Sequence, residues 1–187
     1  MIKKPKFWDY KKPNFISFLL LPLTIPIRLN NFLSNCSFKT KTSKILTICI
    51  GNIYLGGTGK TPTTIKMYQI LNKIFKGTVT AKKFYSSQND EVILLNKKTR
   101  LLIGTNRSEI INAAIKKKKK IIIFDDGLQD KKIDYDLKFA CFDSSSWVGN
   151  GQLIPSGPLR EKLISLKKFD AVFLKNIQKS NQKIIRL

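Results

Sequence analysis

The chain has 187 residues, which is enough for one α/β domain with a hydrophobic core. Its 35 Lys and Arg residues outnumber its 12 Asp and Glu residues, so the formal net charge is +23. The chain contains no histidine, which excludes histidine general bases, histidine metal ligands and Ser-His-Asp triads. Its three cysteines lack metal-ligand spacing, and Cys49 and Cys141 lie in apolar strand-like runs, as is typical of small core residues in a reducing compartment.

The basic excess is almost entirely lysine and has two interpretations. A biased amino-acid composition explains it without any function, whereas selection for charge favours a polyanionic partner such as a nucleotide, a nucleic acid or an anionic membrane. No recognised nucleic-acid motif and no basic patch with interleaved aromatic residues is present. We therefore expect no nucleic-acid partner.

Residues 15–27 form the most hydrophobic stretch and follow a lysine-rich start that includes Lys11 and Lys12. The stretch is too short to span a bilayer as a straight helix, and Pro22 and Pro26 interrupt it. We expect a membrane-associated arm over residues 1–40, peripheral or shallowly inserted into an anionic surface, and a core domain over residues 41–187. A signal peptide and an arm packed on the protein are the alternatives.

A glycine-rich turn between a predicted strand and a predicted helix carries the strongest functional signal. It ends in Gly56-Gly57-Thr58-Gly59-Lys60-Thr61-Pro62, and this pattern predicts a P-loop. The backbone N–H groups and the helix N-terminus would face phosphates, Lys60 would reach their oxygens, and the Thr61 hydroxyl would bind Mg²⁺. Tyr54 occupies the position at which the usual pattern has its first glycine, so the loop is a variant. The alternative is a glycine turn that only caps a helix.

Apolar runs alternate with helix-like segments along the rest of the chain. We predict strands at residues 44–50, 78–81, 100–103, 120–124, 137–142 and 171–175, and helices at 63–75, 107–118 and 159–168. This alternation predicts an α/β, P-loop NTPase-like fold: a mostly parallel sheet flanked by helices, with ligands at the carboxyl ends of the strands.

Two pairs of acidic residues are candidate site residues: one follows a predicted buried strand, and the other precedes an apolar run. Asp125 and Asp126 come directly after residues 120–124 and could hold Mg²⁺ opposite Thr61, or could cap a turn. Asp90 and Glu91 could serve catalysis, although Asn-Asp-Glu before an apolar run is also a helix N-terminus.

The segment 149–161 has two glycine-rich turns and two prolines, which indicates a fixed backbone shape. Arg160 lies at its end, where it could bind a phosphate or a carboxylate through two hydrogen bonds. The alternative is a surface pairing of Arg160 with Glu161 or another acid.

Taken together, these motifs resemble the tetraacyldisaccharide 4'-kinase family, the P-loop kinases that phosphorylate a lipid A precursor. The resemblance runs through the apolar arm, the Gly-Gly-Thr-Gly-Lys-Thr-Pro turn, Asn89-Asp90-Glu91, the run 125–129 (Asp-Asp-Gly-Leu-Gln) and the run 157–161 (Gly-Pro-Leu-Arg-Glu). Members are typically longer, with a further C-terminal portion, and Asp130 stands where the family has a histidine.

The resemblance implies transfer of the γ-phosphate of ATP to the 4'-hydroxyl of a tetraacyldisaccharide 1-phosphate at the cytoplasmic face of the bacterial inner membrane. It implies that Lys60 stabilises the phosphates, that Asp90 accepts the hydroxyl proton, and that Thr61, Glu91, Asp125 and Asp126 surround Mg²⁺. Two alternatives remain at this point: a catalytically incomplete ATP-binding module at the membrane, and a kinase completed by a second polypeptide that supplies the C-terminal portion.

Overall fold

The computed structural model describes residues 4–36, 39–41, 44–84, 89–175 and 182–186. The chain divides into two compact units. One, the sheet unit, comprises Phe38–Gly51 and Gly59–Phe139; the other, the arm unit, comprises Met1–Ser37, Asn52–Thr58 and Ala140–Leu187. The division into residues 1–40 and 41–187 stays a prediction.

Four parallel strands form the centre of the sheet unit, in the order β3-β2-β4-β1. They are β1 (Leu46–Gly51), β2 (Thr78–Lys83), β3 (Leu101–Gly104) and β4 (Ile121–Asp125). Every residue of β4 is buried, as is usual for an inner strand covered on both faces. Its neighbours are in register, with Ile123 opposite both Ile48 of β1 and Thr80 of β2.

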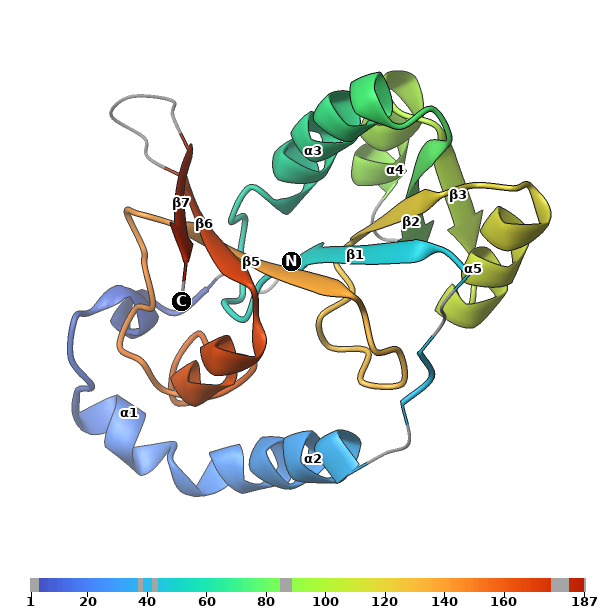
Figure 1. Ribbon diagram of the computed structural model, residues 1–187. Coiled ribbons are helices and arrows are strands. Elements are labelled where there is room, and N and C mark those ends of the chain that lie inside the picture. Colours follow the sequence, from blue (N-terminus) through green and yellow to red (C-terminus); the bar gives the residue numbers. More distant parts are fainter. Residues whose placement is uncertain (1–3, 37–38, 42–43, 85–88, 176–181, 187) are drawn as a thin grey trace. The chain divides into compact units, whose positions relative to one another are not determined.

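Three helices connect these strands: α3 (Lys60–Ile74), α4 (Asn89–Lys98) and α5 (Arg107–Lys116). Figure 1 shows α3 and α4 on one side of the strands and α5 on the other. This arrangement follows from right-handed crossovers, because the strand order reverses direction between β3 and β4. The carboxyl ends of β1, β2 and β4 consequently meet at one edge, where open α/β sheets bind ligands.

The arm unit contains the N-terminal helices and the last strands. Its helical segments are η1 (Lys6–Asp9), α1 (Phe15–Leu19), η2 (Pro22–Thr24), α2 (Ile25–Cys36) and η4 (Leu163–Lys168). The chain enters this unit within β5 (Leu137–Asp143), whose neighbour is β6 (Ala171–Lys175). Strand β7 (Gln182–Arg186) pairs antiparallel with β6.

The predicted strands and two of the three predicted helices are confirmed, and the mostly parallel sheet with flanking helices is the predicted fold class. The helix at residues 159–168 is wrong in its first half. There the Leu159 N–H donates to the carbonyl of Gln152 (3.0 Å) and the Arg160 N–H to that of Ile53 (2.7 Å). Because these N–H groups pair with distant carbonyls, helical geometry begins only with the 3₁₀ turn at Leu163.

Helix α4 and strand β7 were not among the predicted elements. The helix begins at Asn89, so the predicted helix N-terminus at Asn-Asp-Glu is confirmed, with Asp90 and Glu91 in its first turn. A position at a helix N-terminus is compatible with a role in catalysis, because side chains in the first turn of a helix can contact a ligand.

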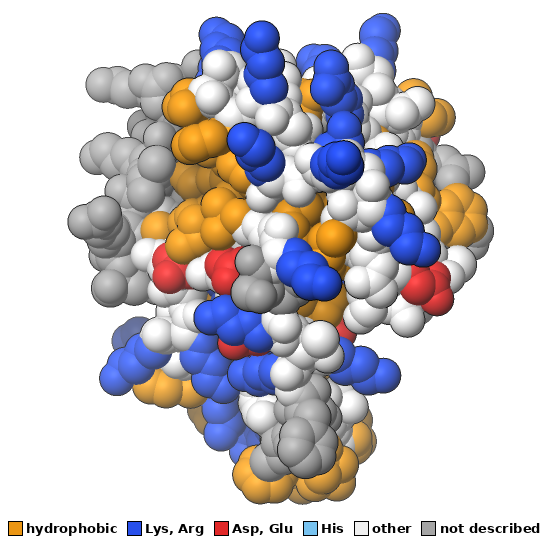
Figure 2. All heavy atoms as spheres, turned by 45° about the vertical axis from the view of Figure 1, so that its right-hand side comes forward, with side chains coloured by type: hydrophobic (Ala, Val, Ile, Leu, Met, Phe, Trp, Pro, Cys, Tyr) orange, Lys and Arg blue, Asp and Glu red, His pale blue; other side chains and the backbone are white. Residues whose placement is uncertain are grey.

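On the face that Figure 2 shows, basic side chains are spread out rather than collected in one stripe. Figure 2 shows them scattered across the visible face with apolar side chains between them. Several belong to the last turns of helices, namely Lys73 in α3, Lys97 and Lys98 in α4, and Lys116 in α5. At these positions a positive charge complements the helix dipole.

Candidate phosphate-binding site

The glycine-rich turn leads directly into helix α3 of the sheet unit. Gly59 is the residue before the helix and has a left-handed backbone (φ 81°), which an L-side chain rarely adopts. Its carbonyl accepts hydrogen bonds from the Thr63 N–H (3.1 Å) and from the Thr63 hydroxyl (2.8 Å). Pro62 lies in the first turn, where an N–H has no intrahelical partner to lose. The start of α3 thus has the geometry of a phosphate cradle.

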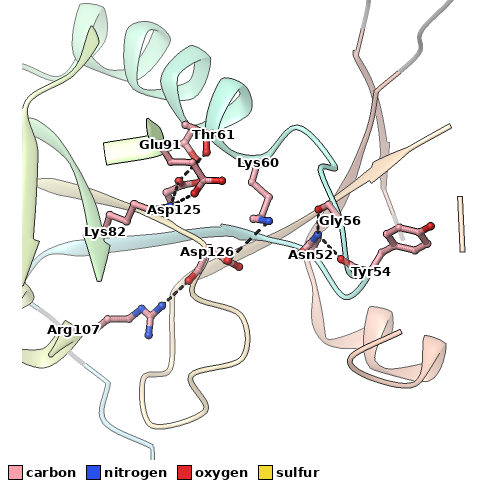
Figure 3. Close-up of polar contacts among 11 residues, drawn as sticks. Asn52, Tyr54, Gly56, Lys60, Thr61, Lys82, Glu91, Arg107, Asp125 and Asp126 are labelled. Atoms are coloured by element: carbon pink, nitrogen blue, oxygen red, sulfur yellow. Dashed lines mark hydrogen bonds and ion pairs between the residues drawn. The ribbon is translucent and has the colours of Figure 1, made fainter. Parts of the chain in front are cut away.

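Lys60 is the first residue of α3, and its side chain is mostly buried. Its ammonium lies 3.9 Å from a carboxylate oxygen of Asp126, which follows β4 (Figure 3). The Asp126 backbone is left-handed (φ 64°), and its N–H donates to the carbonyl of Ile50 at the end of β1 (2.8 Å). The end of β1 and the turn after β4 therefore hold Asp126 in front of the lysine.

Asp125 ends strand β4 and is almost fully buried. One carboxylate oxygen accepts from the Thr61 hydroxyl (3.0 Å), and the other accepts from the Thr64 hydroxyl (3.3 Å). Through these hydrogen bonds, Asp125 links the end of β4 to the start of α3. The structure brings together Lys60, Thr61, Asp125 and Asp126, as the sequence predicts.

Lys82 is a member of this cluster that the sequence analysis did not single out. It lies in β2 with a side chain only 1% exposed, and its ammonium contacts carboxylate oxygens of Asp125 (2.8 Å) and Glu91 (2.5 Å). Burial alone would lower the pKa of Lys82, but the two carboxylates outweigh it and raise the pKa above its ordinary value. The signal that could have identified it is its position directly after the predicted strand at residues 78–81, at the edge where such sheets bind ligands.

Asp90 and Glu91 occupy the first turn of α4, beside this cluster in the fold. Asp90 is exposed, whereas Glu91 is partly buried and is paired with Lys82. The pairing fixes the turn that carries Asp90 relative to the end of β4. An acidic side chain at a helix N-terminus is also stabilised by the helix dipole.

Arg107 provides a further buried cation at the same edge of the sheet unit. Its guanidinium donates to the carboxylate of Asp130 (3.0 Å) and to the backbone carbonyl of Asp126 (2.5 Å). The pair holds the loop after β4 in place and neutralises Asp130. Figure 3 shows Arg107 directed toward this loop.

The first half of the glycine-rich turn belongs to the arm unit and has its own supports. The Asn52 amide donates to the carbonyls of Tyr54 (2.5 Å) and Gly56 (3.2 Å), drawn in Figure 3. Gly56 has a φ of 152°, and a side chain there would meet the Tyr54 ring at 3.2 Å. Gly57 and Thr58 complete the turn, and the Thr58 N–H donates to the Gly56 carbonyl (3.1 Å).

The N-terminal arm contacts this same turn at Tyr54. The Tyr54 hydroxyl donates to Asp9 (2.8 Å), and the ammonium of Lys4 contacts both Asp9 and the Tyr54 hydroxyl. The ammonium also lies 4.8 Å from the centre of the Tyr54 ring, within the range of a cation–π interaction. The tyrosine that replaces the usual glycine therefore anchors the turn to the arm.

Arg160 lies in the arm unit, in the segment that the sequence predicts to be rigid. Its backbone N–H donates to Ile53 (2.7 Å) and its carbonyl accepts from the Asn31 amide (2.9 Å). The Leu55 N–H donates to the carbonyl of Pro158 (2.8 Å). Arg160 is thus attached to the strand-like start of the glycine-rich turn, which fixes the base of its side chain.

The sheet unit therefore combines a helix N-terminus, three cations and four carboxylates at one edge. The cations are Lys60, Lys82 and Arg107, and the carboxylates are those of Glu91, Asp125, Asp126 and Asp130. A helix N-terminus with an adjacent lysine binds phosphates, and a threonine hydroxyl facing carboxylates is suited to Mg²⁺. This arrangement fits phosphoryl transfer from a nucleotide.

Comparison with known proteins agrees with this geometry. A family model described as tetraacyldisaccharide-1-P 4'-kinase matches residues 16–186. A tetraacyldisaccharide 4'-kinase of Pelagibacter ubique is 48% identical over 96% of this chain and 57% of its own length. One of Rickettsia akari is 32% identical over 96% of this chain and 59% of its own. The chain thus spans less than two thirds of the length of these curated relatives.

A solved structure supports the fold. It is described as the "apo" form of LpxK from Aquifex aeolicus in complex with ATP, and it aligns with a TM-score of 0.70. The alignment covers 86% of this chain and 59% of that one, at 22% sequence identity. This similarity supports the predicted P-loop NTPase-like fold over most of the chain.

Proposed function

Because the chain belongs to the tetraacyldisaccharide-1-P 4'-kinase family, we propose that it acts in lipid A biosynthesis as the nucleotide-binding part of such a kinase. The reaction is transfer of the γ-phosphate of ATP to the 4'-hydroxyl of a tetraacyldisaccharide 1-phosphate. The observation that carries the proposal is the contact of α3 with the end of β4, where Lys60 faces Asp126 and Thr61 bonds Asp125.

ATP would bind with its phosphates at the N-terminus of α3. The turn consists of Gly56, Gly57, Thr58 and Gly59. The first N–H groups of α3 have no intrahelical acceptor, so phosphate oxygens would accept their hydrogen bonds. Lys60 would neutralise charge that develops on the transferred group. Arg160, in the arm unit, stays a predicted phosphate-binding residue, and its backbone is fixed by the hydrogen bond of its N–H to Ile53.

The donor set at this edge is suited to Mg²⁺. Among the described residues, no group of three or more His, Cys, Asp or Glu side chains could hold a metal ion alone. Magnesium in phosphoryl-transfer sites is held by one or two carboxylates together with phosphate oxygens and water, so such a cage is not needed. Thr61, Asp125 and Asp126 would hold the ion with help from Glu91, and the ion would neutralise phosphate charge.

Asp90 would accept the proton of the sugar hydroxyl. As it does so, the hydroxyl oxygen would bond to the γ-phosphorus, and the bond between the γ-phosphorus and the bridging oxygen of the β-phosphate would break. The proton then lies on the Asp90 carboxyl and ADP leaves. Asp90 is exposed at the start of α4 and free of the ion pair that holds its neighbour Glu91, among the interactions that the described residues make. Positioning and charge neutralisation supply most of the catalysis in such sites.

Acceptor dependence tests this function. Label from γ-labelled ATP should appear on tetraacyldisaccharide 1-phosphate in mixed micelles with Mg²⁺, and it should not appear on the same lipid already phosphorylated at the 4' position. Equal labelling of both lipids would show that the 4'-hydroxyl is not the acceptor.

Replacement of Asp90 by asparagine should separate binding from chemistry. We expect the ATP dissociation constant to stay within about twofold, because Asp90 takes no part in the phosphate cradle. Removal of a general base lowers the transfer rate by about 10²–10⁴-fold. Calorimetry measures the first quantity and label transfer the second. Asp134→Asn, on the surface of the same unit, is the matched control and should change neither. A transfer rate unchanged in Asp90→Asn would remove Asp90 from this role.

We also propose that the N-terminal arm binds an anionic membrane surface at the cytoplasmic face of the inner membrane. The arm is inverted relative to an ordinary surface helix: Ser17 and Thr24 are fully buried, while Phe15 is 81% exposed and Leu19 is 67% exposed. The same exposure continues through η2 and α2, at Leu23, Ile25, Leu29, Phe32 and Leu33. Apolar side chains in this number require a cover.

The buried polar side chains explain why the apolar ones face outward. Asn150 donates to the Ser17 hydroxyl (2.9 Å) and to the Ser156 carbonyl (3.0 Å), and the Ser156 hydroxyl donates to the Ser17 carbonyl (2.6 Å). These bonds fix α1 with its polar side inward. None of the helices in the described part of the chain has the length and apolar character of a membrane span. A shallow, interfacial contact is consistent with both observations.

Replacing Phe15, Leu19 and Phe32 with serine should release the protein from anionic vesicles. A buried apolar side chain of this size contributes about 1.5 kcal/mol or more, so even partial insertion of three predicts a loss on the order of a hundredfold in partitioning. Vesicle sedimentation measures it. Ile70→Ser with Ile74→Ser, two exposed apolar residues of α3, is the control. Retention of the triple variant at the wild-type level would place the contact elsewhere.

A further inference from the structure

Lys82 is a buried lysine placed between two of the carboxylates assigned to the metal. Its side chain is 1% exposed, and its ammonium lies 2.8 Å from Asp125 and 2.5 Å from Glu91. Lysine is almost never fully buried unless it is paired, so this position is a built feature of the fold. Figure 3 shows the side chain reaching from β2 toward Asp125, with Glu91 beside it.

The register of the sheet places Lys82 at this point. Ala81 pairs with Phe124, so the next residue of each strand, Lys82 and Asp125, lie side by side at the carboxyl edge. Thr80 and Lys82 share one face of β2 because side chains alternate along a strand. Lys83, on the opposite face, is less buried. The strand therefore directs one lysine of the pair, and not the other, into the acidic cluster.

Both carboxylate oxygens of Asp125 already accept hydrogen bonds. One of its oxygens accepts from both Thr61 and Lys82, and the other accepts from Thr64. A divalent ion that bound Asp125 and Glu91 together would have to displace the ammonium or share its carboxylates. An ammonium is a compact cation that satisfies carboxylates much as a metal ion does.

We propose that the Lys82 ammonium is a resident cation of the site, which prevents free divalent metal from binding before the nucleotide. The inference rests on the proposed function for the identity of the site. Without Lys82, Asp125 and Glu91 would be two neighbouring carboxylates, one of them buried, and such a pair attracts a divalent ion strongly. With Lys82 present, the metal enters together with ATP, whose phosphate oxygens supply the ligands that the protein does not.

This arrangement makes the order of binding a property of the protein. Mg·ATP brings its own anionic ligands to the N-terminus of α3, where Lys60 and the helix N–H groups receive them. The carboxylates then need only complete a shell that is mostly phosphate and water. Lys82 acts through Asp125 and Glu91 and does not touch the transferred group, so it is a positioning residue.

The test measures Mn²⁺ binding to the nucleotide-free protein by electron paramagnetic resonance, with no lipid present. Lys82→Met should bind Mn²⁺ at least about tenfold more tightly than wild type, because its carboxylates have lost their cation. Lys82→Arg, which keeps the charge, and Lys97→Met, which removes an exposed lysine at the end of α4, should both match wild type. An affinity of Lys82→Met equal to or weaker than that of wild type overturns the proposal.

Thermal unfolding with and without Mn²⁺ covers a variant that folds poorly. Lys82→Met should then gain more stability from Mn²⁺ than wild type does, because the metal takes the place of the ammonium. A gain no larger than that of wild type also overturns the proposal. Neither measurement involves transfer to a lipid, so failure of the proposed kinase activity and failure of this inference are separate results.

Discussion

Lys60→Ala should lower phosphoryl transfer by roughly 10²–10³-fold, and it should also weaken ATP binding. The lysine is the first residue of α3 and is largely buried opposite Asp126, so its charge acts on phosphates with little screening by water. Removing one preorganised electrostatic contact from such a site costs about this factor in kcat. Calorimetric titration with Mg·ATP and label transfer to the lipid acceptor measure the two effects.

Lys66→Ala is the matched control for this variant. Lys66 lies on the same helix but is exposed to solvent, so its removal changes the net charge equally without touching the cradle. It should bind ATP as wild type does. If the two alanine variants weakened ATP binding equally, long-range charge and not the position of Lys60 would be responsible for its contribution.

Asp125→Asn should destabilise the fold by about 3–5 kcal/mol, because it removes the buried partner of a buried cation. Lys82, whose side chain is 1% exposed, would then face only Glu91, whose side chain is 42% exposed. Denaturant unfolding measures the loss. Asp134→Asn is the control, since Asp134 and Lys138 form a partly exposed pair at the surface, and such pairs contribute about 1 kcal/mol or less.

A second substitution shows whether the unpaired charge is the cause. Lys82→Met in the Asp125→Asn background removes the cation as well, and the double variant should be more stable than Asp125→Asn alone. If the two losses added instead, the interaction of Asp125 with Thr61 and Thr64 would account for its effect on stability. The outcome also bears on Lys82, because only a strongly paired ammonium gives a large coupling energy.

Much of the fold follows from local patterns in the sequence. The apolar runs that become β1 and β4 are continuous, as in strands covered on both faces, and the glycine-rich turn between β1 and α3 identifies the site. The helix predicted at residues 159–168 failed for a tertiary reason. The N–H groups of Leu159 and Arg160 pair with carbonyls of Gln152 and Ile53, and residue patterns contain no information about such distant partners.

The site was predictable only in part for the same reason. Lys60, Thr61, Asp125 and Asp126 belong to motifs with known spacing, so the sequence places them together. Lys82 does not belong to such a motif, and its role depends on the register between β2 and β4. The outward orientation of the apolar side chains of the arm was not predictable either, because Ser17 faces inward only through its hydrogen bonds to Asn150 and Ser156.

We propose that this chain uses its P-loop to phosphorylate a lipid acceptor. The most direct measurement is single-turnover transfer from γ-labelled ATP to tetraacyldisaccharide 1-phosphate, with the wild-type chain in excess over ATP and with Mg²⁺ present. We expect labelled lipid to form at a rate that falls sharply in Asp90→Asn. Tight Mg·ATP binding without any labelled lipid would contradict the claim and would indicate that this chain binds the nucleotide without transferring its phosphate.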